Sequence, residues 1–224
     1  MHAGKGHIDE ITSHGRHAAR VACAPGVIPA PGQYVLTRCQ SDVEDALAFP
    51  VFSAGSCPGG FYAAPPLPVD WRPGTQIDIR GPLGKGFQLP LRARFVALAV
   101  FNRDPARLLA LAEQALAQNA GVVVLMESIP DGLPAANEVA PLAALRETLG
   151  WADYAAFDLP RPALAGVLYE VREAAYSGDG QALVETALPC GGMGECGVCA
   201  VQLRKGHRLA CKDGPVFDLK TLME

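Results

Sequence analysis

Four of the seven cysteines lie within 22 residues near the C-terminal end of the chain. They follow the pattern C-x5-C-x2-C-x11-C and are Cys190, Cys196, Cys199 and Cys211. The thiolate form of cysteine is a metal ligand, so a segment that gathers four cysteines is expected to fold around what they bind. Residues 186–224 have too little apolar content to form a core unaided. The cysteine spacing therefore constrains this segment more than its hydrophobic pattern does.

The spacing favours an iron–sulfur cluster over zinc. Three thiolates on one tight loop with a distant fourth resemble the plant-type ferredoxin arrangement C-x4-C-x2-C…C, with one extra residue in the first gap. A cluster needs backbone close to its sulfides and amides directed at them, which glycine permits. The loop carries four glycines: Gly191, Gly192, Gly194 and Gly197. Structural zinc usually takes two short-spaced pairs, and only one C-x2-C pair is present. We predict one [2Fe–2S] cluster on the four cysteines, with zinc as the alternative.

The rest of the composition excludes several classes of protein. Cys23, Cys39 and Cys57 are scattered, and an odd number of cysteines is not typical of a disulfide framework. The formal net charge of −4 argues against nucleic-acid binding, which needs a basic surface. No apolar run is long enough for a membrane helix, and Met1–Arg20 lacks the apolar region of a secretory signal. We expect a cytoplasmic protein.

The first half of the chain predicts a β-barrel after a flexible tail. Residues 1–30 are expected to be poorly ordered; His14 and His17 could share a metal, although a solvated terminus is the favoured interpretation. Residues 31–92 consist of short apolar runs separated by Gly and Pro, which is typical of a small barrel. The expected strands are Gln33–Thr37, Val51–Ser53 and Gln76–Arg80.

Residues 93–185 predict a small α/β domain of nucleotide-binding type. A buried strand at Phe95–Val100 precedes a helix with Asp104 as its N-cap, and a second strand follows at Val122–Met126. This β-α-β order indicates a parallel sheet. Further elements are expected at Pro141–Leu149 and Pro162–Ala175, both helical, and at Ala182–Thr186, a strand. The fold class is therefore α+β with several domains, ending in the cluster segment at 186–224.

The motifs resemble one known family. Pro189–Leu219, with PCGGMGECGVCAV and LACKDGPVFDL, resembles the C-terminal iron–sulfur segment of the electron-transfer subunit of NAD-dependent dihydroorotate dehydrogenase, a relative of ferredoxin–NADP reductases. Gly81–Phe87 reads GPLGKGF and matches the family's GPLGxGF, and Pro31–Tyr34 matches its PGQF. The resemblance implies a flavin-type barrel that binds FAD, a nicotinamide-type domain and a place in pyrimidine biosynthesis. The cofactor-side residues that it implies are Phe52, Ser53, Gly81, Gly84 and Gly86.

Two departures from the family bear on its cofactors. The flavin signature R-x-[FY]-[ST] reads Pro50–Ser53 here, so the Arg that faces the flavin diphosphate is replaced by Pro. Arg38 or Arg80 could compensate, and the three glycines could equally be plain turn residues. The Gly-rich turn that would bind a dinucleotide phosphate is replaced by Phe101–Pro105, in which Asp104 would repel phosphate. FAD is left open, and NAD binding is not expected.

The leading functional hypothesis is an iron–sulfur electron-transfer subunit of a heteromeric oxidoreductase without a substrate site of its own. Electrons would pass between a flavin-containing, dihydroorotate dehydrogenase-like partner and an acceptor. The alternatives are a structural subunit with inactive nucleotide sites and a metal-stapled tail, and a flavin reductase with another donor. No catalytic group stands out, and four polar residues are expected to be solvated: Glu127, Asp153, Asp158 and His207.

The partner surface is predicted from the position of the cluster. Electron transfer requires close approach to another redox centre, so the loop Gly191–Val198 is expected at the contact. The tail Pro215–Leu219 is expected there too, because Phe217 and Leu219 alternate with Asp218; packing against the chain's own α/β domain is the alternative.

Overall fold

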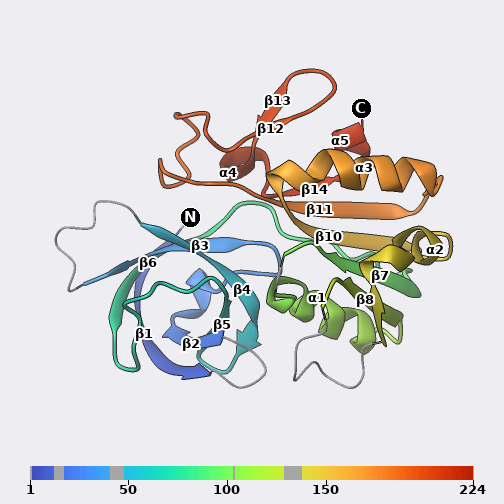
Figure 1. Ribbon diagram of the computed structural model, residues 1–224. Coiled ribbons are helices and arrows are strands. Elements are labelled where there is room, and N and C mark those ends of the chain that lie inside the picture. Colours follow the sequence, from blue (N-terminus) through green and yellow to red (C-terminus); the bar gives the residue numbers. More distant parts are fainter. Residues whose placement is uncertain (1, 13–17, 41–47, 103, 129–137, 224) are drawn as a thin grey trace.

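The computed structural model describes residues 2–12, 18–40, 48–102, 104–128 and 138–223. Within them the chain forms a closed β-barrel and a six-stranded sheet with helices on both faces, and the C-terminal segment spans the two (Figure 1). No helix of the described residues combines the length and the apolar character needed to cross a membrane.

Six antiparallel strands close the barrel in the order β1-β2-β5-β4-β3-β6. The strands are β1 (His2–Thr12), β2 (Ala18–Cys23), β3 (Tyr34–Cys39), β4 (Phe49–Cys57), β5 (Gly60–Ala64) and β6 (Gln76–Leu83), with the 3-10 turn η1 (Pro25–Val27) after β2. Inward-facing side chains fill the interior, as is usual for a small barrel. The largest of them are Ile8, Phe61, Trp71, Ile77 and Ile79.

The prediction of a flexible tail over residues 1–30 is wrong. Strands β1 and β2 pair with each other, and β1 also pairs with β6, so these residues close the barrel. Strand β1 lacks a clear alternation of apolar and polar residues in the sequence, because one of its inward positions is Gly6. A Cβ there would lie 2.7 Å from the carbonyl oxygen of Ala22, so no apolar side chain fits and the alternation is lost. His14 and His17 lie outside the described residues.

The second sheet has the order β14-β11-β10-β7-β8-β9. Five strands are parallel: β7 (Phe95–Val100), β8 (Gly121–Met126), β9 (Glu138–Pro141), β10 (Tyr154–Pro160) and β11 (Asp179–Glu185). Helix α1 (Ala106–Ala117) covers one face. The opposite face is covered by α2 (Leu145–Leu149), α3 (Leu164–Glu173) and α5 (Leu219–Met223), with the turns η2 (Leu142–Ala144) and η3 (Arg161–Ala163) before α2 and α3 (Figure 1). The parallel sheet predicted from the β-α-β pattern is confirmed.

The C-terminal segment belongs partly to this sheet. After the cysteine loop come the hairpin β12 (Ala200–Gln202) and β13 (His207–Leu209), then α4 (Ala210–Asp213) and β14 (Val216–Asp218). Strand β14 pairs antiparallel with β11, and Phe217 is only 4% exposed. The tail Pro215–Leu219 is therefore not an exposed partner surface; of the two expectations, packing on the chain's own domain is correct.

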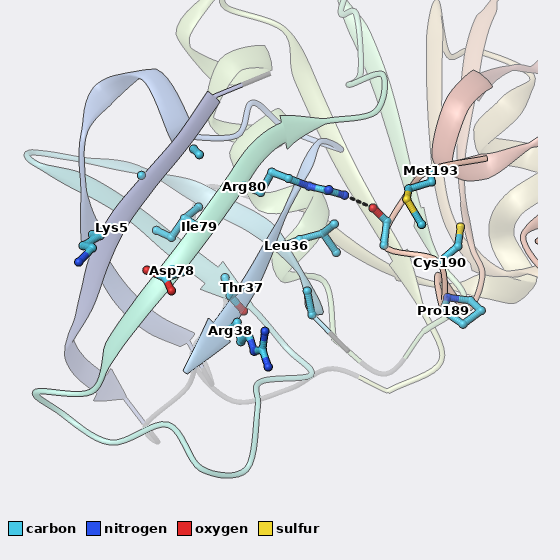
Figure 2. Close-up of a pocket in the computed structure, with 14 residues that line it drawn as sticks. Lys5, Leu36, Thr37, Arg38, Asp78, Ile79, Arg80, Pro189, Cys190 and Met193 are labelled. Carbon is cyan, nitrogen blue, oxygen red and sulfur yellow. Dashed lines mark hydrogen bonds between the residues drawn. The ribbon is translucent and has the colours of Figure 1, made fainter. Parts of the chain in front are cut away.

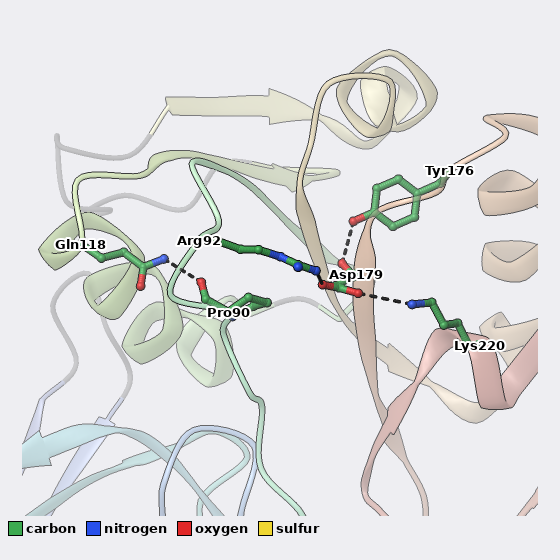
Figure 3. A network of polar contacts seen from close by, with 6 residues as sticks. All are labelled: Pro90, Arg92, Gln118, Tyr176, Asp179 and Lys220. Carbon is green, nitrogen blue, oxygen red and sulfur yellow. Dashed lines mark hydrogen bonds and ion pairs between the residues drawn. The ribbon is translucent and has the colours of Figure 1, made fainter.

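A polar network fixes the linker between the barrel and the sheet (Figure 3). Arg92 of the linker forms an ion pair with Asp179 at 2.7 Å, and Lys220 of α5 reaches the other oxygen of the same carboxylate at 3.3 Å. The side-chain amide of Gln118 donates to the carbonyl of Pro90 at 3.2 Å. The linker is thus attached both to the C-terminal end of α1 and to the start of β11.

Candidate metal-cluster site

The four clustered cysteines come together in two pairs. The sulfur atoms of Cys199 and Cys211 are 3.3 Å apart and buried. The thiol of Cys190 is hydrogen-bonded to that of Cys196, which is exposed. Cys190 of the outer pair and Cys199 of the inner pair both contribute to raising the pKa of the Cys211 thiol, which is consistent with the two pairs lying near each other. The structure thus arranges the four residues that the spacing singled out as two pairs in the same C-terminal segment.

Backbone amides of the loop are directed at the sulfur atoms. Hydrogen bonds from the amide of Gly194 and, more weakly, from the Cys196 thiol and the amides of Cys196 and Glu195 lower the pKa of the Cys190 thiol to about 6. The four loop glycines all have positive φ, which lets successive amides turn inward. Such a concave row of N–H groups is a site for anionic groups. The loop backbone therefore suits a negatively charged centre.

The inner cysteine pair is held by secondary structure. Cys211 lies on α4, and the amide of Ala210 donates to the carbonyl of Cys199 at 3.0 Å. Arg161 donates from the start of η3 to the carbonyls of Val198 and Ala200 at 2.8 and 3.1 Å. Burial is the main reason why the pKa of the Cys211 thiol is raised to about 12. A bound cation would favour its ionisation, so this donor set fits a metal centre that takes thiolates.

The outer surface of the barrel meets the cysteine loop at a cavity of about 690 Å³ (Figure 2). Arg80 of β6 points at the loop and donates to the carbonyl of Gly191. Lys5 and Arg38 line the far part of the cavity. Arg80 is therefore engaged with the cysteine loop, and Arg38 is exposed on the barrel surface. Neither arrangement supports the suggestion that one of them replaces the lost flavin arginine.

The aromatic ring that the family resemblance assigns to a flavin is covered by the chain itself. The guanidinium of Arg107, on the first turn of α1, lies over the Phe52 ring at 5.1 Å from its centroid. Arg107 is buried and pairs with Asp158 of β10 at 3.1 Å and with Glu185 of β11 at 2.6 Å. The prediction that Asp158 is a solvated carboxylate is wrong, because it is 0% exposed in the central strand.

Helix α1 closes the remainder of this seam between barrel and sheet. Ala106 packs with Ala54 and Ala64 of the barrel, and a Cβ on Gly55 would lie 4.0 Å from the Ala110 methyl. Ser53 is buried, and its hydroxyl accepts the amide of Gly55 at 3.2 Å. The side chains on this face do not fit a flavin ring stacked on Phe52, because Arg107 and α1 occupy that place.

The glycines of the GPLGKGF stretch, to which the resemblance assigns a place near the cofactor, are packed closely against the chain itself. A Cβ at Gly84 would lie 2.4 Å from Pro215, and one at Gly86 would lie 2.6 Å from the carbonyl of Pro31. Gly81 packs equally closely on Val35. The amide of Lys85 donates to the carbonyl of Gly214 at 2.6 Å. This stretch thus joins the barrel to the C-terminal segment.

The turn after β7 offers no phosphate cradle among its described residues. The carboxylate of Asp104 accepts the amide of Ala106 at 2.8 Å, so the predicted capping side chain lies at the start of α1. Asn102 donates to the buried Asp158 at 2.8 Å. A carboxylate therefore stands where a dinucleotide phosphate would need free amides.

The other polar candidates lie apart from the site. Glu127, Asp153 and His207 are exposed, as expected. Asp153 accepts the amides of Arg94 and Phe95 at 2.8 and 3.0 Å, which caps a strand end. Sequence reasoning missed Arg107 and Tyr34. Two features of the sequence could have pointed to them. Arg107 is a charged residue within the apolar face of α1, and Tyr34 stands where the family motif has phenylalanine.

Comparisons with known proteins agree with this architecture. Residues 185–223 match the model of the iron–sulfur cluster binding domain of dihydroorotate dehydrogenase B. No curated protein sequence matches the chain. A solved chain of the NADH-dependent reduced ferredoxin-NADP oxidoreductase superposes with a TM-score of 0.74 at 17% identity, covering 97% of this chain and 89% of that one.

Two further solved structures share the fold. The ferredoxin reductase in carbazole 1,9a-dioxygenase superposes with a TM-score of 0.58 at 14% identity, covering 79% of this chain and 64% of that one. A cytochrome P450 reductase from Amycolatopsis gives 0.59 at 14% identity, covering 79% and 67%. The fold and the cysteine site together define an iron–sulfur electron-transfer protein on a ferredoxin reductase-like scaffold. Its C-terminal iron–sulfur domain is of the dihydroorotate dehydrogenase B type.

Proposed function

We propose that this chain carries a [2Fe–2S] cluster on Cys190, Cys196, Cys199 and Cys211 and serves as the electron-transfer subunit of a heteromeric oxidoreductase. The observation that carries the proposal is the convergence of the four thiols in two pairs inside the segment that matches the cluster-binding domain. No three His, Cys, Asp or Glu side chains among the described residues are close enough to hold a single metal ion. Two pairs thus suit a two-iron centre better than zinc.

When bound, the cluster supplies a one-electron redox centre. The chain's own residues hold and tune it: the inward amides of the glycine loop stabilise negative charge, and Arg80 fixes the loop through the Gly191 carbonyl. Electron exchange takes place on the side of Cys196, which is exposed. Met193, at 61% exposure, and Val198, at 46%, flank this opening with apolar surface.

The partner that this opening fits is a flavin-containing dehydrogenase related to dihydroorotate dehydrogenase. The match of residues 185–223 to the iron–sulfur cluster binding domain of dihydroorotate dehydrogenase B supports this choice. The reducing compartment expected from the unpaired cysteines is the cytoplasm. A link to pyrimidine biosynthesis follows if the partner oxidises dihydroorotate.

We further propose that the seam between barrel and sheet holds neither FAD nor NAD. Arg107 on the Phe52 ring, Pro50 in place of the signature arginine and Asp104 at the start of α1 support this view. Electrons would then enter and leave through the cluster alone, with the flavin on the partner. The acceptor would then bind to the same exposed loop as the dehydrogenase, and the two proteins would occupy it alternately.

The test is anaerobic co-expression with the candidate dehydrogenase, followed by purification at moderate salt. We expect a complex with two irons per copy of this chain, visible absorption bleached by dithionite, and an electron paramagnetic resonance signal of a reduced [2Fe–2S] centre. If the partner's substrate reduces the cluster, so that this signal appears when the substrate is added, electron transfer is established. A monomer that exchanges electrons rapidly with NADH would contradict the proposal.

A structural subunit is the second candidate, because the closed seam is what a scaffold with inactive nucleotide sites would retain. In that case the metal would only stabilise the fold of the C-terminal segment and would take no part in electron transfer. Bound zinc, or a metal centre that dithionite does not reduce, would favour this candidate. The inward amides of the loop favour the redox role, since a staple has no need of them.

A further inference from the structure

Tyr34 presents a buried hydroxyl that has no partner. The residue begins β3 in the PGQY element, and its ring is fully buried between Phe52, at a centroid distance of 5.6 Å, and the backbone at Gly84. No hydrogen-bond partner for the hydroxyl occurs in the described part of the chain. A buried hydroxyl left unpaired costs about 1–3 kcal/mol, and native structures seldom leave one. The orphan donor therefore indicates an acceptor that binds nearby.

The surroundings of this hydroxyl identify the acceptor. A Cβ built on Gly192 would lie 3.0 Å from the hydroxyl oxygen, so the ring ends directly beneath the cysteine loop. Burial and, after it, charge on three of the thiols raise the pKa of Tyr34 above its ordinary value. Those thiols are Cys211, Cys199 and Cys190. The hydroxyl thus faces the inner side of the site, where the acceptors are sulfur atoms.

We propose that Tyr34 donates a hydrogen bond to a sulfur atom of the bound cluster and thereby raises its reduction potential. The direction follows from electrostatics, because the reduced cluster carries one more negative charge and gains more from a donor than the oxidised cluster does. Tyr34 is a positioning residue and takes no part in bond making. This inference rests on the cluster assignment of the proposed function.

The hydroxyl is an addition relative to the family pattern. The motif that Pro31–Tyr34 resembles ends in phenylalanine, so this chain keeps the aromatic ring and adds one donor. Gly192 makes room for it, since any side chain there would approach the oxygen to 3.0 Å or less. With Arg80 on the adjacent loop carbonyl, the barrel supplies two polar contacts to the cluster segment.

Tyr34→Phe in the full-length holoprotein is the decisive variant, because it removes only the oxygen. We expect unchanged iron content and a more negative reduction potential of the cluster. The expected shift is about 59 mV, which for a one-electron couple is about a tenfold change in the ratio of reduced to oxidised cluster. The matched control is Tyr154→Phe, since that buried hydroxyl donates to Gln181 at 2.8 Å in the sheet. The control should leave the potential unchanged.

Two measurements separate this role from packing. Denaturation of the metal-free protein should show that Tyr34→Phe is neutral or stabilising, because it removes an unsatisfied hydroxyl, whereas the loaded protein should lose stability. Resonance Raman spectra of the wild type should show iron–sulfur bands that shift in D2O, and part of that shift should vanish in Tyr34→Phe.

The outcomes are distinguishable from failure of the proposed function. A wild type without a reducible cluster overturns the cluster assignment and this inference together. A wild type with a reducible cluster whose potential and deuterium shift are the same in Tyr34→Phe overturns only the role of Tyr34. If Tyr34→Phe loses iron, the test is the shift of the iron–sulfur Raman bands of the wild type in D2O. Absence of that shift contradicts the inference.

Discussion

The guanidinium of Arg107 lies 5.1 Å from the centroid of the Phe52 ring, so helix α1 places its buried charge on an aromatic face of the barrel. A cation over an aromatic face contributes about 0.5–2 kcal/mol, depending on how far it is desolvated. Asp158 and Glu185 compensate the charge from two strands of the sheet. One residue therefore joins the barrel to the sheet, at the ring that the family resemblance assigns to a flavin.

The first prediction is that the purified holoprotein contains iron but no stoichiometric flavin. Flavin released by heat and measured by fluorescence should be far below one per chain, because Arg107 occupies the stacking face of Phe52. Pro50→Arg alone should not restore binding, since it supplies a phosphate contact but leaves the face covered. One tightly bound flavin per chain would refute the closed seam.

The second prediction concerns stability and its pH dependence. Arg107→Met should lower the free energy of unfolding at pH 8 by about 3–5 kcal/mol, because Asp158 is left buried without its cation. Burial already raises the pKa of Asp158 to about 6, and the variant should raise this pKa further. Urea denaturation at pH 5 and pH 8 is the measurement.

The sign of the pH effect follows from proton linkage. A folded-state pKa above the unfolded value means that the folded carboxyl binds its proton more tightly. The unfolded state is the same in both proteins, so the deficit of Arg107→Met is full above the variant's folded pKa and shrinks as the pH falls from there toward the wild-type folded pKa of about 6. Adding Asp158→Asn should remove most of this dependence; a deficit that stays constant with pH would contradict the explanation.

Motifs with local chemistry were readable from the sequence. The cysteine spacing singled out the segment in which the four thiols lie as two pairs, and the apolar run Phe95–Val100 predicted β7 with the same bounds. The predicted helix after Asp104 corresponds to α1. In each case, interactions within a short stretch of chain determine the structure.

Elements defined by distant contacts were not readable. Strand β1 has glycine at an inward position, so its membership of the barrel depends on β2 and β6. Strand β10 is rich in small residues and carries Asp158, whose burial depends on Arg107 of another element. The contact of Arg107 with the Phe52 ring likewise depends on α1 meeting β4 across more than 50 residues of sequence.

The third prediction separates the two groups of cysteines. Replacing any of Cys190, Cys196, Cys199 or Cys211 by Ser should lose or destabilise the cluster, as measured by iron content and visible absorption. The triple replacement of Cys23, Cys39 and Cys57 by Ser should retain wild-type iron. These three cysteines lie on strands β2, β3 and β4 of the barrel and not in the C-terminal segment. Loss of iron with Cys39→Ser alone would overturn the assignment.

The fourth prediction concerns Arg161, which holds the carbonyls on both sides of Cys199. Arg161→Ala should leave the iron content of fresh protein unchanged but make the loss of iron to a chelator several-fold faster, because the loop loses two hydrogen bonds. Arg172→Ala on the neighbouring helix α3 is the control, since within the described residues its side chain makes no hydrogen bond to the loop. Equal rates of iron loss in the two variants would show that Arg161 does not support the loop.

The last prediction places the partner surface on the cysteine loop and not on the tail. Met193→Glu and Val198→Glu should weaken binding of the dehydrogenase at least tenfold, because both side chains are exposed beside Cys196 and a charge there must be desolvated on docking. Phe217→Ala should instead lower stability by about 3–5 kcal/mol, because Phe217 packs in the core of the sheet. Affinity measured by titration calorimetry, with thermal melts of each variant, distinguishes the two effects. Full affinity in both glutamate variants, with normal iron content, would move the interface elsewhere on the molecule.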